Sequence, residues 1–392
     1  MSAPLTVAWI TYFPIEWLDR LPPELASLPK MHPATWQRVL LAELQKEPDL
    51  RVHVIALRKQ FPRSMSFESG NTTFHCVRVP GGLRAPSFFW TDTRSVARVL
   101  KSVQPDLVHA WGTENAAGLV ASRLPYPYLL TMQGIMSWMI ELGLANLYQR
   151  FVARLEKTTL RRARHVTVES RFAVDYLAAR YAGLHPRQIE HAPDWGFHRA
   201  PRQPRLDPPR IICIGTLSQA KGTDVLLQAL DSLRHEQRFE VVLVGGASAE
   251  TLAQYRASVS PELWSRIAFK NHLTSAQVAE ELSSAALMVY PTRADNSPNA
   301  VKEAVAAGVP VVASAIGGIV DYVIPGENGF LFPAGNVEGC RGAIRSALGH
   351  ETLGKGHVPS DALGRLRDYL SPATMCRKFL EAYRIAASAP HR

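Results

Sequence analysis

The chain has 392 residues, of which 46% are hydrophobic and 20% are charged, and its formal net charge is +10. This length is enough for two domains of ordinary size, and the composition excludes a disordered or low-complexity protein. The four cysteines are scattered without a Cys-x-x-Cys pair, which argues against a zinc site or a disulfide scaffold and favours a reducing compartment. Because the first residues lack a basic start followed by an apolar run, we expect no signal peptide and a cytoplasmic chain.

The excess of basic residues lies mostly in the first 200 residues. Such a distribution indicates an acidic partner, for example an anionic lipid or a phosphorylated acceptor, although a solvated basic surface would look the same. Nucleic acid is disfavoured as a partner, because the charge is not accompanied by zinc-finger spacing or an RNP-like aromatic signature.

The first half of the chain alternates short apolar strands with helical stretches. This alternation favours an α/β fold with a doubly wound parallel sheet that holds ligands at the carboxyl ends of its strands. We predict a first domain over residues 1–195 and a linker over the proline- and arginine-rich segment 196–209. Strands are predicted at 5–13, 52–57, 73–80, 105–112, 127–134 and 165–170, and helices at 35–47, 93–103, 114–122, 139–163 and 171–182.

Residues 147–164 place Leu147, Phe151 and Leu155 on one side of a helix and cluster arginines toward its end. A helix of this kind is compatible with an anionic membrane surface. It is also compatible with a core-facing apolar side, because arginines are favoured near a helix C-terminus by the helix dipole. Both interpretations stay open, and we favour packing against the core.

The strand–helix pattern starts again after the linker. A second domain is predicted over residues 210–370, followed by a long helix at 371–389 within a C-terminal segment 371–392. Strands are predicted at 211–217, 239–246, 267–273, 286–291 and 310–316, and helices at 223–235, 249–258 and 275–284.

The first turn of the second domain carries candidate phosphate-binding residues. A predicted strand ends at Gly215, and the following loop contains Lys221 and Gly222. A lysine there can act as a cation against a diphosphate, and a glycine lets the backbone approach closely.

The segment from Tyr290 to Val320 reads as strand, loop, helix, turn and strand. Ser297 is predicted to cap the helix, with Pro298 in its first turn and Gly308 just past its end. The free amides from Ser297 to Asn299 suit an anionic phosphate. Two carboxylates, Asp295 in the loop and Glu303 in the second helical turn, can accept hydrogen bonds from sugar hydroxyls. The alternative is an ordinary crossover with solvated charges.

This segment resembles the signature of the retaining glycosyltransferases of family 4. In that family an acidic residue, seven others and a Glu are followed by a helix of small residues and a strand like PVVA; here the two carboxylates are Asp295 and Glu303. The similarity continues through Gly317, Gly318 and Asp321 to PGENGFLF. The resemblance implies the GT-B fold, with two Rossmann-like domains facing a cleft and the final helix returning to the first domain.

The resemblance also implies roles for the residues. Asp295 would contact the transferred sugar, Glu303 the ribose of the nucleotide and Lys221 the diphosphate of a UDP- or GDP-sugar. The loop at 215–222 resembles the family's Gly-Arg-Leu…Lys-Gly element, except that Thr216 stands where the family has Arg. The remaining donor-binding candidates share a position in the loops around the nucleotide: Gly215, Thr216, Gly222, Gly245, Asn296, Ser297, Pro298 and Asn299.

No Asp-x-Asp pair is present, so we expect a transfer that needs neither a metal ion nor another cofactor. The acceptor would be a glycan or a lipid-linked saccharide, as in the biosynthesis of cell-envelope polysaccharides. Two alternatives stay open: a nucleotide-sugar epimerase of the same fold, and a non-catalytic saccharide-binding descendant, suggested by Thr216.

Acceptor-side candidates come from the first domain by the same resemblance. The strand PDLVHAWG carries His109 where the family often has His-x-His, although a lone histidine at a strand end is more often structural. Gln133 and Gly134 stand where the family places residues that line the cleft, and Glu114 and Glu169 are weaker candidates of the same kind.

Overall fold

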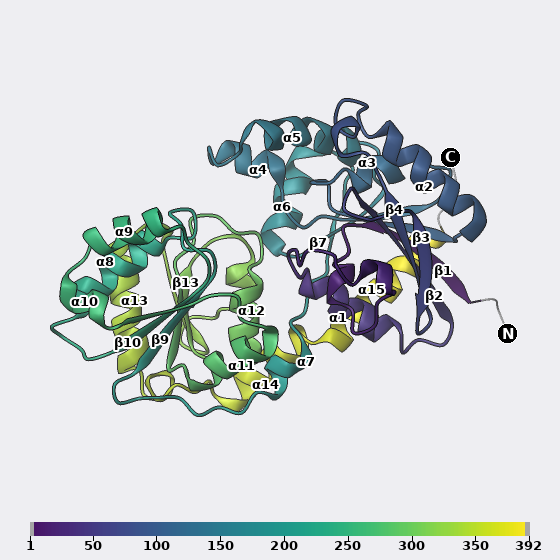
Figure 1. The fold of residues 1–392 in the computed structure, drawn as a ribbon. Coiled ribbons are helices and arrows are strands. Elements are labelled where there is room, and N and C mark those ends of the chain that lie inside the picture. Colours follow the sequence, from purple (N-terminus) through teal and green to yellow (C-terminus); the bar gives the residue numbers. More distant parts are fainter. Residues whose placement is uncertain (1–3, 389–392) are drawn as a thin grey trace. The chain divides into compact units, whose positions relative to one another are not determined.

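The computed structural model describes residues 4–388. The chain divides into two compact units, each built around a parallel sheet (Figure 1). Unit 1 contains the residues up to Glu169, Ala173–Glu190 and those from Pro372 onward, and unit 2 contains Ser170–Phe172 and His191–Ser371. Among residues 4–388, no helix is long and apolar enough to cross a membrane.

Unit 1 has an eight-stranded sheet in the order β3-β4-β2-β1-β5-β6-β7-β8. Only β3 runs antiparallel, as one arm of a hairpin with β4. The order reverses between β1 and β5, and ligands of open α/β sheets bind outside the carboxyl ends of strands at such a point. The strands are β1 (Leu5–Thr11), β2 (Leu50–Arg58), β3 (Met65–Ser69), β4 (Thr72–Arg78), β5 (Leu107–Trp111), β6 (Tyr128–Thr131), β7 (His165–Val168) and β8 (Arg187–Gln188).

Helices cover both faces of this sheet. Helices α2, α3 and α5 pack together on one face, and α1 packs with α15 on the other (Figure 1). The helices of unit 1 are α1 (Thr35–Leu44), α2 (Trp90–Val103), α3 (Ala117–Ala121), α4 (Met136–Glu141), α5 (Leu147–Leu160), α6 (Arg171–Arg180) and α15 (Pro372–Ala387), with short 3-10 turns at Ile15–Trp17, Pro23–Leu25 and Gly81–Leu83.

Helix α15 is joined to the sheet by a buried chain of hydrogen bonds. The Trp9 indole Nε1–H donates to the hydroxyl of Tyr383 at 3.1 Å, and that hydroxyl lies 2.8 Å from Nδ1 of His109. The other ring nitrogen of His109 lies 2.6 Å from Oγ1 of Thr131, which in turn lies 2.6 Å from Oγ1 of Thr167. One residue of the last helix therefore completes a polar network inside a core made by β1, β5, β6 and β7.

Replacing Tyr383 by Phe should destabilise unit 1 by about 1–3 kcal/mol, because the buried indole N–H of Trp9 loses its acceptor. The measurement is the free energy of unfolding in urea. Tyr148→Phe is the control, since that hydroxyl lies on an exposed side chain of α5. Equal stabilities of the two variants would show that the hydrogen-bond chain contributes nothing.

Unit 2 has a six-stranded, fully parallel sheet in the order β11-β10-β9-β12-β13-β14. The order reverses between β9 and β12. The strands are β9 (Arg210–Ile214), β10 (Glu240–Val244), β11 (Ile267–Lys270), β12 (Leu287–Tyr290), β13 (Val311–Ser314) and β14 (Gly329–Phe332). The helices are α7 (Trp195–Arg199), α8 (Thr223–Leu233), α9 (Ala249–Ala257), α10 (Pro261–Ser265), α11 (Ser275–Ser284), α12 (Asn299–Ala306), α13 (Val337–Gly349) and α14 (Ser360–Tyr369), with 3-10 turns at Gly317–Asp321 and Leu353–Lys355.

The predicted elements differ from the observed ones in three ways. The single helix expected at 139–163 is two helices, α4 and α5, separated by a turn in which Gly143 has a positive φ of 70°. The segment 196–209 begins within α7, and all of it belongs to unit 2. The strands β3, β8 and β14 and the helices α10, α13 and α14 were not predicted.

Candidate donor site

The site in unit 2 is built from two loops at the carboxyl ends of adjacent strands. Residues 215–222, here the Lys221 loop, follow β9, and residues 291–298, here the Asp295 loop, follow β12. Since β9 and β12 are hydrogen-bonded neighbours on either side of the point where the strand order reverses, both loops emerge at the expected ligand-binding edge.

An ion pair joins the two loops. The ammonium of Lys221 lies 2.5 Å from a carboxylate oxygen of Asp295, and the hydroxyl of Tyr290 donates to the same oxygen at 2.9 Å. Asp295 is mostly buried, whereas the Lys221 side chain is one-third exposed. The structure thus brings together two residues predicted from positions 74 apart in the sequence, and it adds Tyr290, which sequence reasoning missed.

Close approach of backbone segments explains two of the predicted glycines. Gly222 has a φ of 71°, and a Cβ atom there would lie 1.9 Å from the carbonyl oxygen of Pro291. Gly245 has a φ of 153°, and a Cβ atom there would lie 1.9 Å from the carbonyl oxygen of Gly215. Any other residue at either position would displace a loop, so these glycines hold the loops together.

Arg293 fixes the Lys221 loop to the Asp295 loop. Its guanidinium makes two hydrogen bonds of 2.7 Å to the carboxylate of Asp224, and it also donates to the carbonyl of Gln219 at 2.5 Å. The backbone N–H of Arg293 donates to the carbonyl of Ala220. Sequence reasoning missed this residue, because nothing in the local pattern indicates that positions 224 and 293 meet. Thr216, in the same loop, is exposed.

The start of α12 differs from the prediction that Ser297 caps the helix. Helix α12 begins at Asn299 with Pro298 as its N-cap residue and with no capping side chain. The prediction is wrong because the Ser297 side chain is buried, with its Oγ 3.3 Å from the hydroxyl of Tyr322. Because the N-cap residue is a proline, its side chain accepts no hydrogen bond from the amides of the first turn of α12, which suits an anion site there. Gly308 follows the helix with a φ of 75°, as predicted.

Two contacts hold the Asp295 loop in place: one with Ser170 and one with the turn after β13. Asn296 accepts a hydrogen bond of 2.7 Å from the hydroxyl of Ser170. Gly317 has a φ of 56°, and a Cβ atom there would lie 1.9 Å from the carbonyl oxygen of Asp295. The paired glycines at 317 and 318 thus let the turn after β13 pack directly on the backbone of the Asp295 loop.

Glu303 lies in the second turn of α12 and is half-buried. Burial raises the pKa of its carboxyl to about 8, the adjacent Lys302 opposes this rise, and the negative charge of Asp194 adds to it. The carboxyl therefore ionises readily at neutral pH only beside a partner that stabilises the carboxylate, for example a pair of hydroxyl groups that donate hydrogen bonds to it.

In unit 1, Glu114 and Gly134 come together at the ends of β5 and β6. The backbone N–H of Gly134 donates to Glu114 Oε1 at 2.6 Å, and a Cβ atom at Gly112 would lie 2.2 Å from Oε2. Burial raises the pKa of Glu114, and the nearby charge of Glu156 also raises it. Gln133 precedes Gly134 in the same loop. These candidates lie at the carboxyl ends of β5 and β6, next to the point between β1 and β5 where the strand order of unit 1 reverses.

His109 is a core residue, and its prediction as an acceptor-side residue is wrong. Its side chain is fully buried, both ring nitrogens lie in the hydrogen-bond chain described above, and its ring packs on Trp9, Trp111 and Phe379. Its position in the middle of β5, rather than after the strand, explains the difference. Glu169, one of the weaker candidates, is also buried.

No group of three or more His, Cys, Asp or Glu side chains that could hold a metal ion is present within the part of the chain that the structure describes. The groups that the unit 2 site itself presents are one ammonium, one hydrogen-bonded carboxylate, the amides at the start of α12 and one carboxyl of raised pKa.

Two family models match the chain. The model "Glycosyl transferase 4-like domain" matches residues 35–195, and the model "Glycosyl transferases group 1" matches residues 208–350. Among curated proteins, the chain is 26% identical over 255 residues to a glycogen synthase of Mycobacterium tuberculosis, covering 63% of this chain and 61% of that protein. It is 31% identical over 129 residues to a D-inositol 3-phosphate glycosyltransferase of Xylanimonas cellulosilytica, covering 32% of this chain and 30% of that protein. The chain thus spans less than two thirds of either relative.

Solved structures share the whole architecture. The sucrose-phosphate synthase of Thermosynechococcus elongatus superposes with a TM-score of 0.74 at 20% identity, over 98% of this chain and 100% of that chain. HepE of Anabaena, whose structure was solved with UDP and glucose, superposes with a TM-score of 0.70 at 15% identity, over 97% of this chain and 100% of that chain. These likenesses establish the GT-B fold. The two family models, which between them match most of the chain's length, show that it belongs to the glycosyl transferases group 1, of the family 4 type.

Proposed function

We propose that the protein is a retaining glycosyltransferase that transfers a hexose from a nucleotide sugar to a hydroxyl of a saccharide or lipid-linked saccharide. The observation that supports this most is the Lys221–Asp295 pair, which lies at the strand-order reversal of unit 2 beside the uncapped start of α12. A cation, a carboxylate and free helix amides in one place match the chemistry of a sugar diphosphate.

In this proposal the ammonium of Lys221 binds the diphosphate and Asp295 binds the hydroxyls of the transferred sugar. The bond between the anomeric carbon and the diphosphate oxygen breaks, and the acceptor oxygen bonds to that carbon on the same face. The acceptor proton passes to the departing diphosphate, so no separate side-chain base is needed. Lys221 and the α12 amides stabilise the negative charge that grows on the diphosphate oxygen.

Tyr290 and Arg293 have positioning roles. The Tyr290 hydroxyl holds Asp295, and Arg293 holds the loop that carries Lys221. Glu303 binds the ribose, where two neighbouring hydroxyls favour the ionised carboxylate. We propose UDP as the first nucleotide to test and GDP as the second, because HepE, a structure of the same fold, was solved with UDP-glucose.

The acceptor is proposed to meet Glu114, Gln133 and Gly134 of unit 1. Glu114 is held in place by the Gly134 amide, and its raised pKa lets it donate a hydrogen bond when protonated or accept one when ionised. A saccharide acceptor is in keeping with the names of the relatives, a glycogen synthase and an inositol phosphate glycosyltransferase. A cytoplasmic location is part of this proposal, and the four free, buried cysteines are compatible with it.

A donor panel tests the proposal. The pure protein is incubated with UDP- and GDP-sugars, with and without a mixture of oligosaccharide acceptors, and the release of nucleoside diphosphate and the sugar product are measured. Acceptor-dependent release of the diphosphate together with an α-linked product from an α-linked donor supports the proposal. Epimerised sugar, or tight binding of a saccharide without any release of diphosphate, would point to one of the two alternative functions.

Activity should survive chelation. Because Lys221 and helix amides are proposed to neutralise the diphosphate, EDTA should leave the turnover of the best donor unchanged. The control is an EDTA sample to which excess magnesium or manganese has been added back. A complete loss of turnover in EDTA that either metal restores would show that the diphosphate is neutralised by a metal ion instead.

A further inference from the structure

Unit 1 exposes a group of large apolar side chains around the starts of α2 and α5. Leu147 is 86% exposed and Tyr148, beside it, is 50% exposed, while Phe88 and Trp90 at the start of α2 are 54% and 51% exposed. Leu83 also lies exposed in the turn before α2. Exposing large apolar side chains to water is unfavourable in free energy, and a contiguous group of them is typical of a contact surface.

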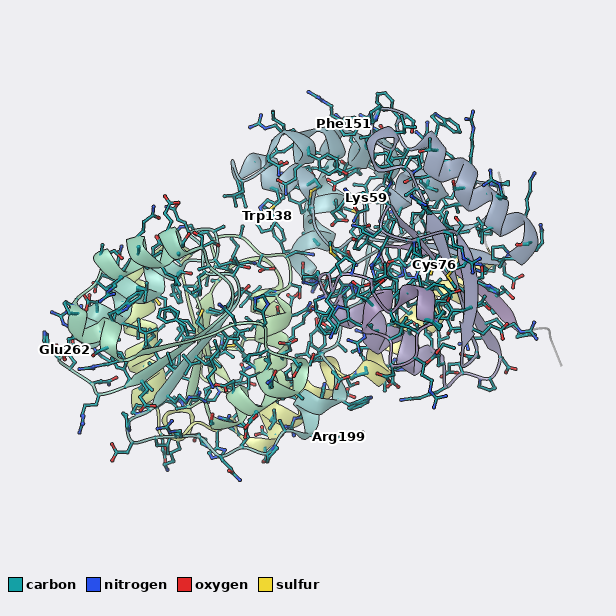
Figure 2. The ribbon with its side chains drawn as sticks, in the orientation of Figure 1. Lys59, Cys76, Trp138, Phe151, Arg199 and Glu262 are labelled. Carbon is teal, nitrogen blue, oxygen red and sulfur yellow. The ribbon has the colours of Figure 1, made fainter. Side chains whose placement is uncertain are left out.

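The two helix starts form one surface. The rings of Phe88 and Phe151 pack with centroids 5.9 Å apart, which joins the turn before α2 to the first turns of α5. Figure 2 shows Phe151 on the outer side of unit 1. Arg123 strengthens the same junction, because its guanidinium donates to the carbonyl of Phe88 and lies 4.4 Å from the ring centre of Trp90.

Exposed basic side chains lie next to this apolar group, along both α2 and α5. On α5, the exposed residues Arg150, Arg154, Lys157 and Arg161 follow Leu147 at intervals of three or four, so they lie along one side of the helix. None of these four forms an ion pair with any residue of the range 4–388. On α2, exposed Arg94, Arg98 and Lys101 follow Trp90 with the same spacing.

The acidic residues of both helices point inward. Helix α2 has one carboxylate, Asp92, which is buried and paired with Arg84. Helix α5 also has one, Glu156, which is fully buried and accepts hydrogen bonds from Thr113, Met136 and Ser137. The exposed charged side chains of α2 and α5 are therefore all basic. Their mutual repulsion favours contact with an anionic partner.

We propose that this surface, the exposed sides of α2 and α5 with the turns that precede them, docks the protein on a membrane rich in anionic lipids. A lipid bilayer can bind the basic and the apolar side chains of this surface at once. Lipid phosphates would pair with the arginines and lysines, and the bilayer interface would bury Leu147, Phe88, Trp90 and Tyr148. A soluble polyanion would use the cations and leave Leu147 in water.

The observed packing of α5 refines the sequence-based interpretation. The predicted core-facing side is only partly buried: Phe151 packs against Val152 and its buried neighbours, and Leu155 is half-buried, whereas Leu147 is exposed. The line from Leu147 through Arg150 and Arg154 faces solvent. Docking through a surface of unit 1 would bring a lipid-linked saccharide to the enzyme. This consequence rests on the proposed function, but membrane binding itself does not.

Vesicle flotation with the full chain tests the proposal without donor or acceptor, so its result is independent of catalysis. The probes are vesicles of phosphatidylcholine alone and vesicles of phosphatidylcholine mixed with phosphatidylglycerol in equal amounts. The wild-type protein should float only with the mixed vesicles, and less so as salt is added. Each basic residue at such a surface strengthens binding roughly fivefold, so Arg150→Glu with Arg154→Glu should weaken it at least about 20-fold.

Two matched controls distinguish binding through this surface from effects of the protein's net charge and of exposed apolar side chains in general. Arg377→Glu with Arg384→Glu changes the net charge equally, but these exposed residues lie on α15, which packs on the other face of the sheet, so binding should match that of wild type. Leu147→Gln should weaken binding roughly tenfold, whereas Leu206→Gln, at an exposed leucine of unit 2, should not weaken it.

Four results would overturn the proposal. The wild-type protein could fail to float with the mixed vesicles, or the two charge-reversed pairs could weaken binding equally, which would indicate a net-charge effect. Leu147→Gln could bind like wild type, which would indicate a site for soluble polyanions. Sedimentation could show a dimer that Leu147→Gln dissociates, which would mean that the surface pairs with a second copy of the chain.

Discussion

Lys221→Ala should lower turnover about 10²–10³-fold while the protein stays folded. Removing one preorganised group that stabilises developing negative charge has an effect of this size. Arg293, the cation of the Asp295 loop, is paired with Asp224 and so does not replace the ammonium. Affinity for UDP should fall as well. The measurements are steady-state kinetics with the best donor and calorimetric titration with UDP.

The control for this variant is Lys355→Ala, which removes an exposed lysine elsewhere in unit 2. Asp295→Asn is the second control, because it breaks the same ion pair but leaves the ammonium in place. If Lys221 acts only by tethering the two loops, the Lys221→Ala and Asp295→Asn variants should bind UDP equally weakly. If Lys221 binds the diphosphate, Asp295→Asn should keep UDP affinity and lose turnover. Wild-type affinity in Lys221→Ala would remove the phosphate site from the proposal.

Thr216→Arg extends the same experiment. Thr216 is exposed in the Lys221 loop and stands where the family has Arg, so a guanidinium placed there should keep or raise UDP affinity. In the Lys221→Ala background it should restore part of the lost affinity. A fall in affinity on introducing this arginine would mean that the loop does not face the diphosphate.

Glu303→Gln should cost one to two decades of nucleotide affinity, because a charge-assisted hydrogen bond to the ribose contributes roughly 1.5–3 kcal/mol. The pH dependence makes the test sharper. The carboxyl is neutral below its pKa of about 8, so a ligand that requires the ionised form must displace a proton at lower pH. The affinity of wild type relative to Glu303→Gln should therefore rise with pH, by up to tenfold per unit, and level off above about 8.

The stability of the unliganded protein should depend on pH in the opposite direction to its nucleotide affinity, and Glu303→Gln tests this as well. A folded-state pKa above the ordinary value means that ionisation of Glu303 costs stability, and that this cost grows as the pH rises toward about 8. Without ligand, Glu303→Gln should therefore be more stable than wild type at alkaline pH. In the affinity test of the preceding paragraph, the same dependence of nucleotide affinity on pH in wild type and in Glu303→Gln would show that Glu303 does not bind the nucleotide.

Much of this fold could be predicted from the sequence, because buried parallel strands are short apolar runs between turn residues. Strands β5, β9 and β12 were found for this reason. Strand β3 was missed because its side chains alternate between half-buried and exposed, which leaves no apolar run. The break between α4 and α5 has a local signal, a capping box in which Asn146 and Gln149 exchange hydrogen bonds, and the apolar periodicity around it concealed this signal.

The candidate site shows the same division between local and long-range information. The positions of Lys221 and Asp295 followed from motifs, and the ion pair between them follows from the order of β9 and β12, which a local pattern does not contain. His109 was misjudged because its environment depends on Tyr383, a residue 274 positions away on the last helix. Ser297 resembled a helix cap, but the hydroxyl of Tyr322 offered its side chain a buried partner instead.

Because α15 packs in unit 1, it determines the order in which the two units can complete their folding during synthesis on the ribosome. Every residue of unit 2 is synthesised before Pro372, whereas the hydrogen-bond chain through Trp9 and His109 stays open until Tyr383 has left the exit tunnel. The half of the enzyme made second can thus reach its native state first. The half made first must wait, with part of its core uncovered, until α15 has been synthesised.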